Sequence, residues 1–156
     1  MSGLDRELLA EKAAAIERHL ERVAEHLPRD PAELRPATSA SDTVILHLWQ
    51  GTQIAIDLAL AACLRLHLGT PTGYADAFRR LAEAGRLDPE LARRLGLAVG
   101  FRNVIAHTYE KLDMARVWRS ASEGPADLRA FVAALRRFPE LARADHAGPG
   151  QLPPRP

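Results

Sequence analysis

The apolar run between Ser41 and Gly69 constrains the fold of this chain most strongly. A helix on the surface of a domain is apolar along one stripe, whereas this run is apolar on more than one side. It predicts a helix in the middle of a bundle or in a subunit interface, capped by Ser41-Asp42 and ended at Gly69. The apolar residues of the run are Val44, Leu46, Leu48, Ile54, Ile56, Leu58, Leu60 and Leu64.

One further helix is predicted before this run and another after it. Apolar residues three, four or eight positions apart predict a helix over residues 4–27, which Pro28 ends. Residues 28–40 contain three prolines without a clear period, so they predict a loop or an irregular turn. A helix is also expected over residues 74–84, with Gly85 as its stop.

The second half of the chain predicts three more helices. Asp88-Pro89 supplies a cap and a proline at the first helical position, and an apolar stripe continues to Ile105. A short helix is expected over residues 113–120. Gly124-Pro125 is expected to break the chain before a last helix, which starts near Asp127 and reaches about residue 138.

The composition agrees with an all-α fold. Apolar residues make up 47% of the chain and aromatic residues only 5%, and alanine and leucine favour helix over strand. No alternating strand pattern competes with the helices. We therefore expect a bundle of four to six helices in one domain over residues 1–145, followed by a disordered tail at 146–156.

Charge and cysteine content narrow the function. The 21 basic and 20 acidic residues nearly cancel, so global charge does not indicate nucleic acid. Residues 91–119 instead carry about four excess positive charges, enough to raise the local affinity for phosphate. Cys63, the single cysteine, is expected to be a buried small hydrophobe, and no Cys/His cluster has zinc spacing. The charged N-terminus and the absence of a long uninterrupted apolar stretch predict a soluble cytoplasmic protein that does not cross a membrane.

One short stretch gathers three reactive groups. Arg102, His107 and Tyr109 lie within about two helical turns. On a straight helix, however, Arg102 and His107 point about 140° apart, so they cannot easily grip one phosphate. Either the helix loosens near Ala106, or a second copy of the chain supplies the missing group across a two-fold axis. The second alternative predicts a homodimer with a composite site.

The residue types suit cleavage of RNA by its own 2′-hydroxyl. His107 can act as general base or general acid near neutral pH, and the planar guanidinium of Arg102 can stabilise the extra charge of the phosphorane. No metal or other cofactor is required. The amide of Asn103 could orient the imidazole or bind a phosphate oxygen. Asp57 lies in the apolar run, where a carboxylate needs a partner, and it could brace Arg102. Alternatively, Asp57 could bind another arginine or lie exposed in a groove.

The surrounding sequence resembles the HepT-like toxins of the HEPN superfamily of helical ribonucleases. The resemblance covers roughly residues 44–118. It rests on a proline-containing loop at 69–73, the Tyr74…Phe78 helix and the Arg102-Asn103…His107-Thr108-Tyr109 motif in the family order. Members of this family often have a serine before the tyrosine that corresponds to Tyr74, whereas this chain has Gly73. This difference affects the cap of the helix at 74–84 and does not change the motif.

The resemblance implies an up-and-down helical bundle that forms a homodimer. It implies metal-independent cleavage of RNA, either tRNA or mRNA, by Arg102 and His107, with Asn103 in support. It also implies a nucleotidyltransferase antitoxin that neutralises the toxin by transferring AMP from ATP to Tyr109, where an added phosphate would repel RNA.

Alternative interpretations remain open for the motif and for several other residues. The chain could be a non-catalytic helical subunit that docks a nucleotidyltransferase, or a structural dimer without a ligand. His19 and His26 are expected to be solvated, and His47 and His67 to be surface or interface groups. Packing roles are expected for four aromatic residues, Trp49, Tyr74, Phe78 and Trp118. Trp118, near the basic stretch, could instead stack on a base.

Overall fold

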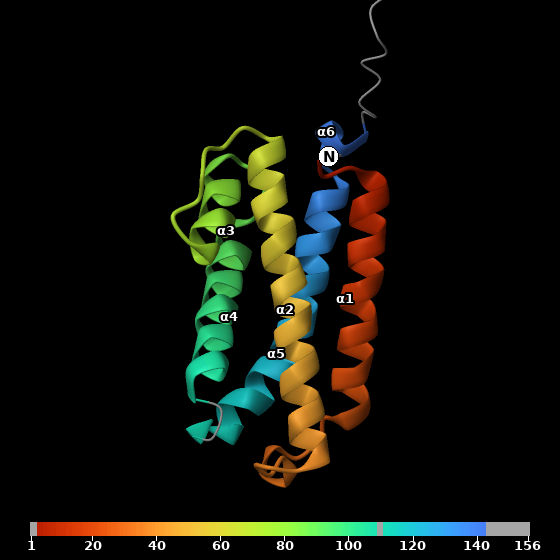
Figure 1. The fold of residues 1–156 in the computed structure, drawn as a ribbon, viewed down its shortest axis with the longest axis vertical. Coiled ribbons are helices and arrows are strands. Elements are labelled where there is room, and N and C mark those ends of the chain that lie inside the picture. The colour runs from red at the N-terminus through yellow and green to blue at the C-terminus, as the bar shows by residue number, and fades with distance from the viewer. Residues whose placement is uncertain (1–2, 109–110, 143–156) are drawn as a thin grey trace, which may run out of the picture.

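The computed structural model describes residues 3–108 and 111–142, and this part of the chain is an all-helical bundle without a strand (Figure 1). The order of its elements is α1 (Arg6–His26), the 3-10 turn η1 (Pro31–Glu33), α2 (Ser39–Arg65), α3 (Tyr74–Glu83), α4 (Pro89–Thr108), α5 (Met114–Arg136) and α6 (Pro139–Ala142). The long helices run up and down (Figure 1). The expected fold class is therefore confirmed for the described residues, which do not include the predicted tail at 146–156.

Helix α2 is the central element, as its apolar run predicts. It lies between α1 and α5 on one side and the α3–α4 pair on the other (Figure 1). By length and composition alone α2 could cross a membrane, but half of its most apolar window is buried inside the bundle, as in the core helix of a helical domain. Buried residues of α2 join both apolar cores of the protein.

The larger core takes residues from α1 to α6 and contains the two largest fully buried side chains. Phe78 of α3 and Phe131 of α5 meet edge to face, with 5.2 Å between ring centroids. Both rings are almost fully buried. Because the quadrupoles of two rings favour this arrangement, the contact fixes α3 against α5 beyond what apolar burial alone provides.

The smaller core lies where α4 ends and α5 begins, beneath the Arg102 motif. Phe101 and Ile105 of α4 pack there with Val117 and Ala121 of α5. These two α4 residues are one turn apart and therefore share a face. Their burial fixes the rotation of α4 and so determines where the residues between and beside them point.

Local capping sets most helix starts, with one correction for α2. Asp5 and Asp88 accept hydrogen bonds from the first turns of α1 and α4, as expected for caps. Helix α2, however, is capped by Thr38 rather than by Ser41-Asp42. Thr38 Oγ1 accepts from the Ser41 amide and Ser41 Oγ accepts from the Thr38 amide, both at 3.1 Å. This reciprocal box requires partners three residues apart, so the helix begins earlier than predicted.

Helix α5 contradicts the predicted break at Gly124-Pro125. It is continuous across both residues, where the sequence predicts two separate helices. Proline removes a backbone donor and disfavours a helix interior. Ala121 and Leu128, on either side of Pro125, are each 2% exposed, so tertiary packing holds both halves in line.

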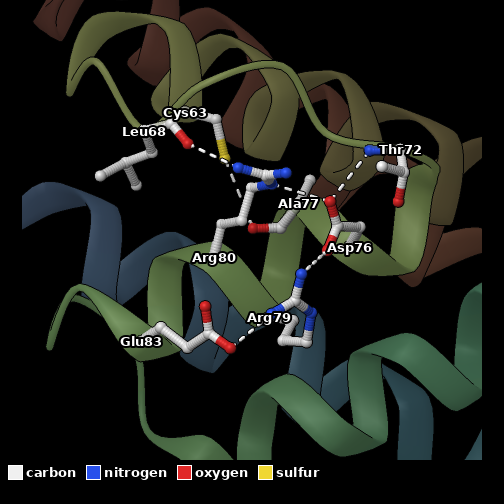
Figure 2. Close-up of polar contacts among 8 residues, drawn as sticks. All are labelled: Cys63, Leu68, Thr72, Asp76, Ala77, Arg79, Arg80 and Glu83. Carbon is white, nitrogen blue, oxygen red and sulfur yellow. Dashed lines mark hydrogen bonds and ion pairs between the residues drawn. The ribbon is translucent and has the colours of Figure 1, made fainter.

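The segment after α2 is anchored by a polar cluster around Asp76 of α3 (Figure 2). One carboxylate oxygen accepts from the Thr72 amide at 2.9 Å and from Arg80 Nε at 2.7 Å. Arg80 also donates to the carbonyl of Leu68 at 2.9 Å, and Arg79 pairs with the other carboxylate oxygen. These bonds, led by the one from Arg80, hold the pKa of Asp76 well below its usual range. The cluster fixes the start of α3.

Cys63 lies beside this cluster and confirms the expected buried thiol. Its side chain is inaccessible, and Sγ donates to the carbonyl of Ala77 at 3.4 Å (Figure 2). Burial raises the pKa of the thiol, so it stays protonated and unreactive near neutral pH.

Candidate functional site

Arg102 is the most constrained group of the motif. Its Cζ lies 5.2 Å from the centroid of the Trp49 ring and 5.9 Å from that of Tyr74. Arg102 Nη1 donates to Asn103 Oδ1 at 3.1 Å, whereas Nε is buried without a hydrogen-bond acceptor among the described residues. Two aromatic rings therefore hold a guanidinium that still has a donor to offer.

Tyr74 and Trp49 reach Arg102 from different helices. Tyr74 begins α3, which the Asp76 cluster anchors, and its side chain is 41% exposed rather than in the core as expected. Trp49 is half-buried on α2, and its Nε1 has no acceptor among the described residues. Packing roles alone were expected for these two rings, and their contact with Arg102 was not predicted. Residue spacing within one helix does not show which faces of different helices pack together.

His107 lies in the last turn of α4 and is exposed. The helix continues through Ala106 to Thr108, so the first way of bringing Arg102 and His107 together, a loosened helix, is not realised in this chain. The two side chains leave the helix in different directions, about 140° apart on a regular α-helix. The described helix therefore does not bring the imidazole of His107 and the guanidinium of Arg102 onto one face.

The other predicted site residues have mixed outcomes. Asn103 is exposed and accepts from Arg102 instead of contacting His107. Asp57 lies on the exposed side of α2 and accepts from Gln53 Nε2 at 3.0 Å, so it does not brace Arg102. Tyr109 lies outside the described residues.

A cavity of about 310 Å³ opens beside Arg102, between α4 and α5 and over α2. Four of the six basic residues of the stretch 91–119 line it, so the local excess of positive charge predicted from the sequence is gathered at one place. The lining arginines are Arg94, Arg102, Arg116 and Arg119. Sequence charge was the signal for this feature, but only the packing of α4 against α5 brings the four guanidinium groups together.

Trp118 and a pair of histidines lie outside the motif. Trp118 Nε1 donates to the carbonyl of Pro28 at 2.8 Å, which agrees with a packing role. His19 and His47 share a hydrogen bond of 2.9 Å between their Nδ1 atoms, so His19 is not simply solvated. Burial is the main cause that lowers the pKa of both imidazoles. Within the described residues, no three His, Cys, Asp or Glu side chains are arranged to hold a metal ion.

An all-helical bundle with four arginines around one cavity is a protein suited to a phosphate-bearing ligand. Residues 12–135 match the family model described as Ribonuclease HepT-like. The chain belongs to this family, and it is an endoribonuclease of the all-α class.

Individual relatives agree with this assignment. The chain is 25% identical over 130 residues to the mRNA nuclease HepT of Shewanella oneidensis, a match that covers 83% of this chain and 97% of that protein. It is also similar to the tri-AMPylated HEPN toxin of Shewanella oneidensis in complex with an MNT antitoxin. The TM-score is 0.76 at 25% identity, over 84% of this chain and 98% of the toxin. The Bacillus subtilis protein YutE shares the fold alone, with a TM-score of 0.71 at 14% identity over 87% and 91% of the two chains.

Proposed function

We propose that this chain is the toxin of a toxin–antitoxin pair, a metal-independent ribonuclease that acts as a homodimer. The observation that carries the proposal is Arg102, whose guanidinium is held by Trp49 and Tyr74 with a buried donor still free. In a mechanism without metal, such a fixed cation is the group needed to bind a phosphodiester and stabilise its transition state. The mRNA nuclease relative supports RNA as the substrate.

The proposed reaction is an internal transfer at phosphorus. A general base takes the proton of the ribose 2′-hydroxyl, and the 2′-oxygen attacks the adjacent phosphorus while Arg102 binds the phosphate oxygens. The bond to the 5′-oxygen breaks, and that oxygen takes a proton from a general acid. We assign the proton transfers to His107. The products are a 2′,3′-cyclic phosphate and a free 5′-hydroxyl, so no redox partner is involved.

The dimer is part of this proposal because Arg102 and His107 diverge on one helix. We infer that Arg102 of one protomer and the partner's His107 act on the same phosphate. The matching RNA is a tRNA or an mRNA, and the antitoxin is a nucleotidyltransferase that transfers AMP to Tyr109. The AMPylated relative in complex with its antitoxin supports this form of control. Asn103, bonded to Arg102, is proposed to hold the guanidinium in place. We also propose that residues 1–145 form a single domain and that residues 146–156 form a disordered tail.

Substitution of the two motif residues tests the catalytic assignment. Arg102→Ala and His107→Ala should each abolish growth arrest and RNA cleavage in vitro, while circular dichroism and dimer mass stay unchanged. Arg93→Ala is the matched control, since Arg93 is an exposed arginine of the same helix that pairs with Glu90. Cleavage that survives both motif substitutions would refute the mechanism and favour the non-catalytic docking subunit.

A mixture of the two variants tests the composite site. If Arg102 and the partner's His107 form each site, a mixed dimer of Arg102→Ala and His107→Ala chains keeps one intact site and loses the other. Random mixing should restore about one quarter of the wild-type activity, because about half the dimers are mixed and each has one of two sites. No recovery in a demonstrably mixed dimer would exclude a site shared in this way.

Co-expression with the nucleotidyltransferase encoded beside the toxin tests the control of toxicity. The intact mass of the wild-type chain should rise by whole AMP units, and Tyr109→Phe should show no such gain. A gain that persists in Tyr109→Phe would place the modification on another residue.

A further inference from the structure

We propose that the cavity between α4 and α5 is a subsite for one nucleobase of the RNA, next to the phosphate that Arg102 binds. The inference rests on the proposed ribonuclease function and extends it from the phosphate to the base. The sequence motif explains the reacting groups, but it does not account for a cavity of about 310 Å³ beside them. This volume lies at the lower end of the range of small-ligand sites and suits a nucleoside.

The floor of the cavity is apolar, which suits the faces of an aromatic base. It is formed by side chains from three helices, all of them buried: Leu48, Leu95, Phe101, Ile105 and Leu128. Trp49 forms part of the wall. A base that leaves its stack in single-stranded RNA exchanges that contact for an apolar or aromatic surface of this kind.

Two of the lining residues also carry buried donors that lack acceptors. Arg102 Nε and Trp49 Nε1 both belong to lining residues, and neither has an acceptor among the described residues. A buried donor without a partner is unfavourable, and a shift of either side chain toward the cavity would let its nitrogen meet an acceptor of the ligand. A phosphate oxygen and the carbonyl or ring nitrogen of an adjacent base supply such acceptors.

The charge at the rim selects a polyanion rather than an apolar peptide. Arg116 lies over the Phe101 ring at 5.1 Å, and neither Arg116 nor Arg119 has an ion pair with a described residue. Arg94 is already engaged by Asp127 at 3.1 Å. Glu123 is the remaining acidic side chain of the lining, so the rim keeps a positive excess. This pattern, an apolar floor under free guanidinium groups, complements a nucleotide.

Substrates that lack a single base test the subsite during cleavage. Oligoribonucleotides carry the mapped cleavage position and lack the base on either the 5′ or the 3′ side of the scissile phosphate. For the wild-type chain, loss of one of these bases should lower kcat/KM by about 10-fold or more, the range of base–aromatic stacking. Equal cleavage of the intact RNA and of both abasic RNAs would overturn the proposal.

A variant that fills the cavity provides the matched comparison. Ala98 of α4 lines the cavity, and Ala98→Leu keeps a good helix former while adding volume there. On intact RNA, Ala98→Leu should lower kcat/KM by about the same factor as removal of the sensitive base does for the wild-type chain. On the RNA that lacks this base, Ala98→Leu should lower kcat/KM little further. Equal losses on both substrates would mean that no base occupies the cavity. Arg129→Ala, a change on α5 outside the cavity, should leave both rates unchanged.

A binding experiment separates failure of the subsite from failure of the nuclease. The probes are oligoribonucleotides that carry fluorescent 2-aminopurine at one position at a time, bound to the His107→Ala chain so that cleavage is not needed. We expect a fluorescence change on binding that is lost when Ala98→Leu is added, while the double variant keeps the same helical spectrum. That result with a wild-type chain that cleaves no RNA would refute the nuclease and support the subsite. If the chain cleaves RNA at the same rate whichever adjacent base is missing, and no fluorescence change occurs on binding, the nuclease is supported and the base subsite is refuted.

Discussion

Arg102 of α4 lies over the ring of Trp49 of α2, with 5.2 Å between the guanidinium carbon and the ring centroid. This contact joins the motif helix to the central helix of the bundle. It also removes freedom from a long side chain before any ligand arrives. A fixed guanidinium loses less entropy when it binds a phosphate than a freely rotating one, so the contact prepares the site.

Replacement of Trp49 should therefore reduce activity more than stability. Trp49→Leu keeps much of the apolar volume and removes the aromatic face, a contact worth about 0.5–2 kcal/mol. We expect kcat/KM for RNA cleavage to fall by about 2- to 30-fold. The control is Trp118→Phe, which removes the bond to the Pro28 carbonyl, lowers stability by about 1 kcal/mol and leaves the activity of the folded protein unchanged. A Trp49→Leu enzyme with full activity would show that Arg102 needs no aromatic support.

Asp76→Asn should destabilise the protein at neutral pH, because it removes the charge that Arg80 and Arg79 bind. The folded-state pKa of Asp76 is depressed, so its contribution to stability is present above the unfolded pKa of about 3.9. That contribution is lost as the pH falls from this value through the lower folded pKa. Urea unfolding should show a large difference between wild type and Asp76→Asn at pH 7 and a smaller one at pH 3. A difference that grows on acidification would contradict the assignment.

Pro125→Ala should raise stability. Pro125 lies inside α5, where it cannot donate to the helix and where its ring crowds the preceding turn. Alanine restores the missing hydrogen bond, and we expect a gain of about 1–3 kcal/mol, seen as a higher Tm. The exposed neighbour Ser122→Ala should stay within about 0.5 kcal/mol of wild type. A lower Tm for Pro125→Ala would mean that the local geometry of α5 depends on the proline.

The Phe78–Phe131 pair should show measurable coupling. Each single change to alanine removes a fully buried ring and should cost about 3–5 kcal/mol. The double variant should lose less than the sum of the two, with about 0.5–1.5 kcal/mol of coupling from the edge-to-face contact. Urea unfolding of the wild type, the two single variants and the double variant gives the free energies of this double-mutant cycle. Leu64→Ala, at a residue that is 76% exposed, is the control and should have little effect on stability. Strictly additive losses would rule out a specific ring contact.

The helical class was predictable because its causes are local. Apolar spacing places α1, α3 and the start of α4 within about two residues of their observed bounds, and Asp5, Asp88 and Gly85 act where such caps and stops are expected. Helix α2 instead begins at Ser39 and ends at Arg65, earlier at both ends than the predicted cap at Ser41-Asp42 and stop at Gly69. The same local signals failed at Gly124-Pro125, where burial on both sides of the proline outweighs the preference of one residue. Propensity is a small free energy per residue, and packing of a long helix exceeds it.

The sequence by itself determined the family, the helical class and the placement of Arg102, Asn103 and His107 on a single helix. It did so because helix periodicity and capping depend on neighbours only a few residues apart. Tertiary structure alone decided that Trp49 and Tyr74 reach Arg102, that Asp57 faces solvent, and that four arginines surround one cavity. Those outcomes depend on which faces of α2, α3, α4 and α5 pack together, and that choice minimises exposed apolar area over the whole bundle rather than along any one segment.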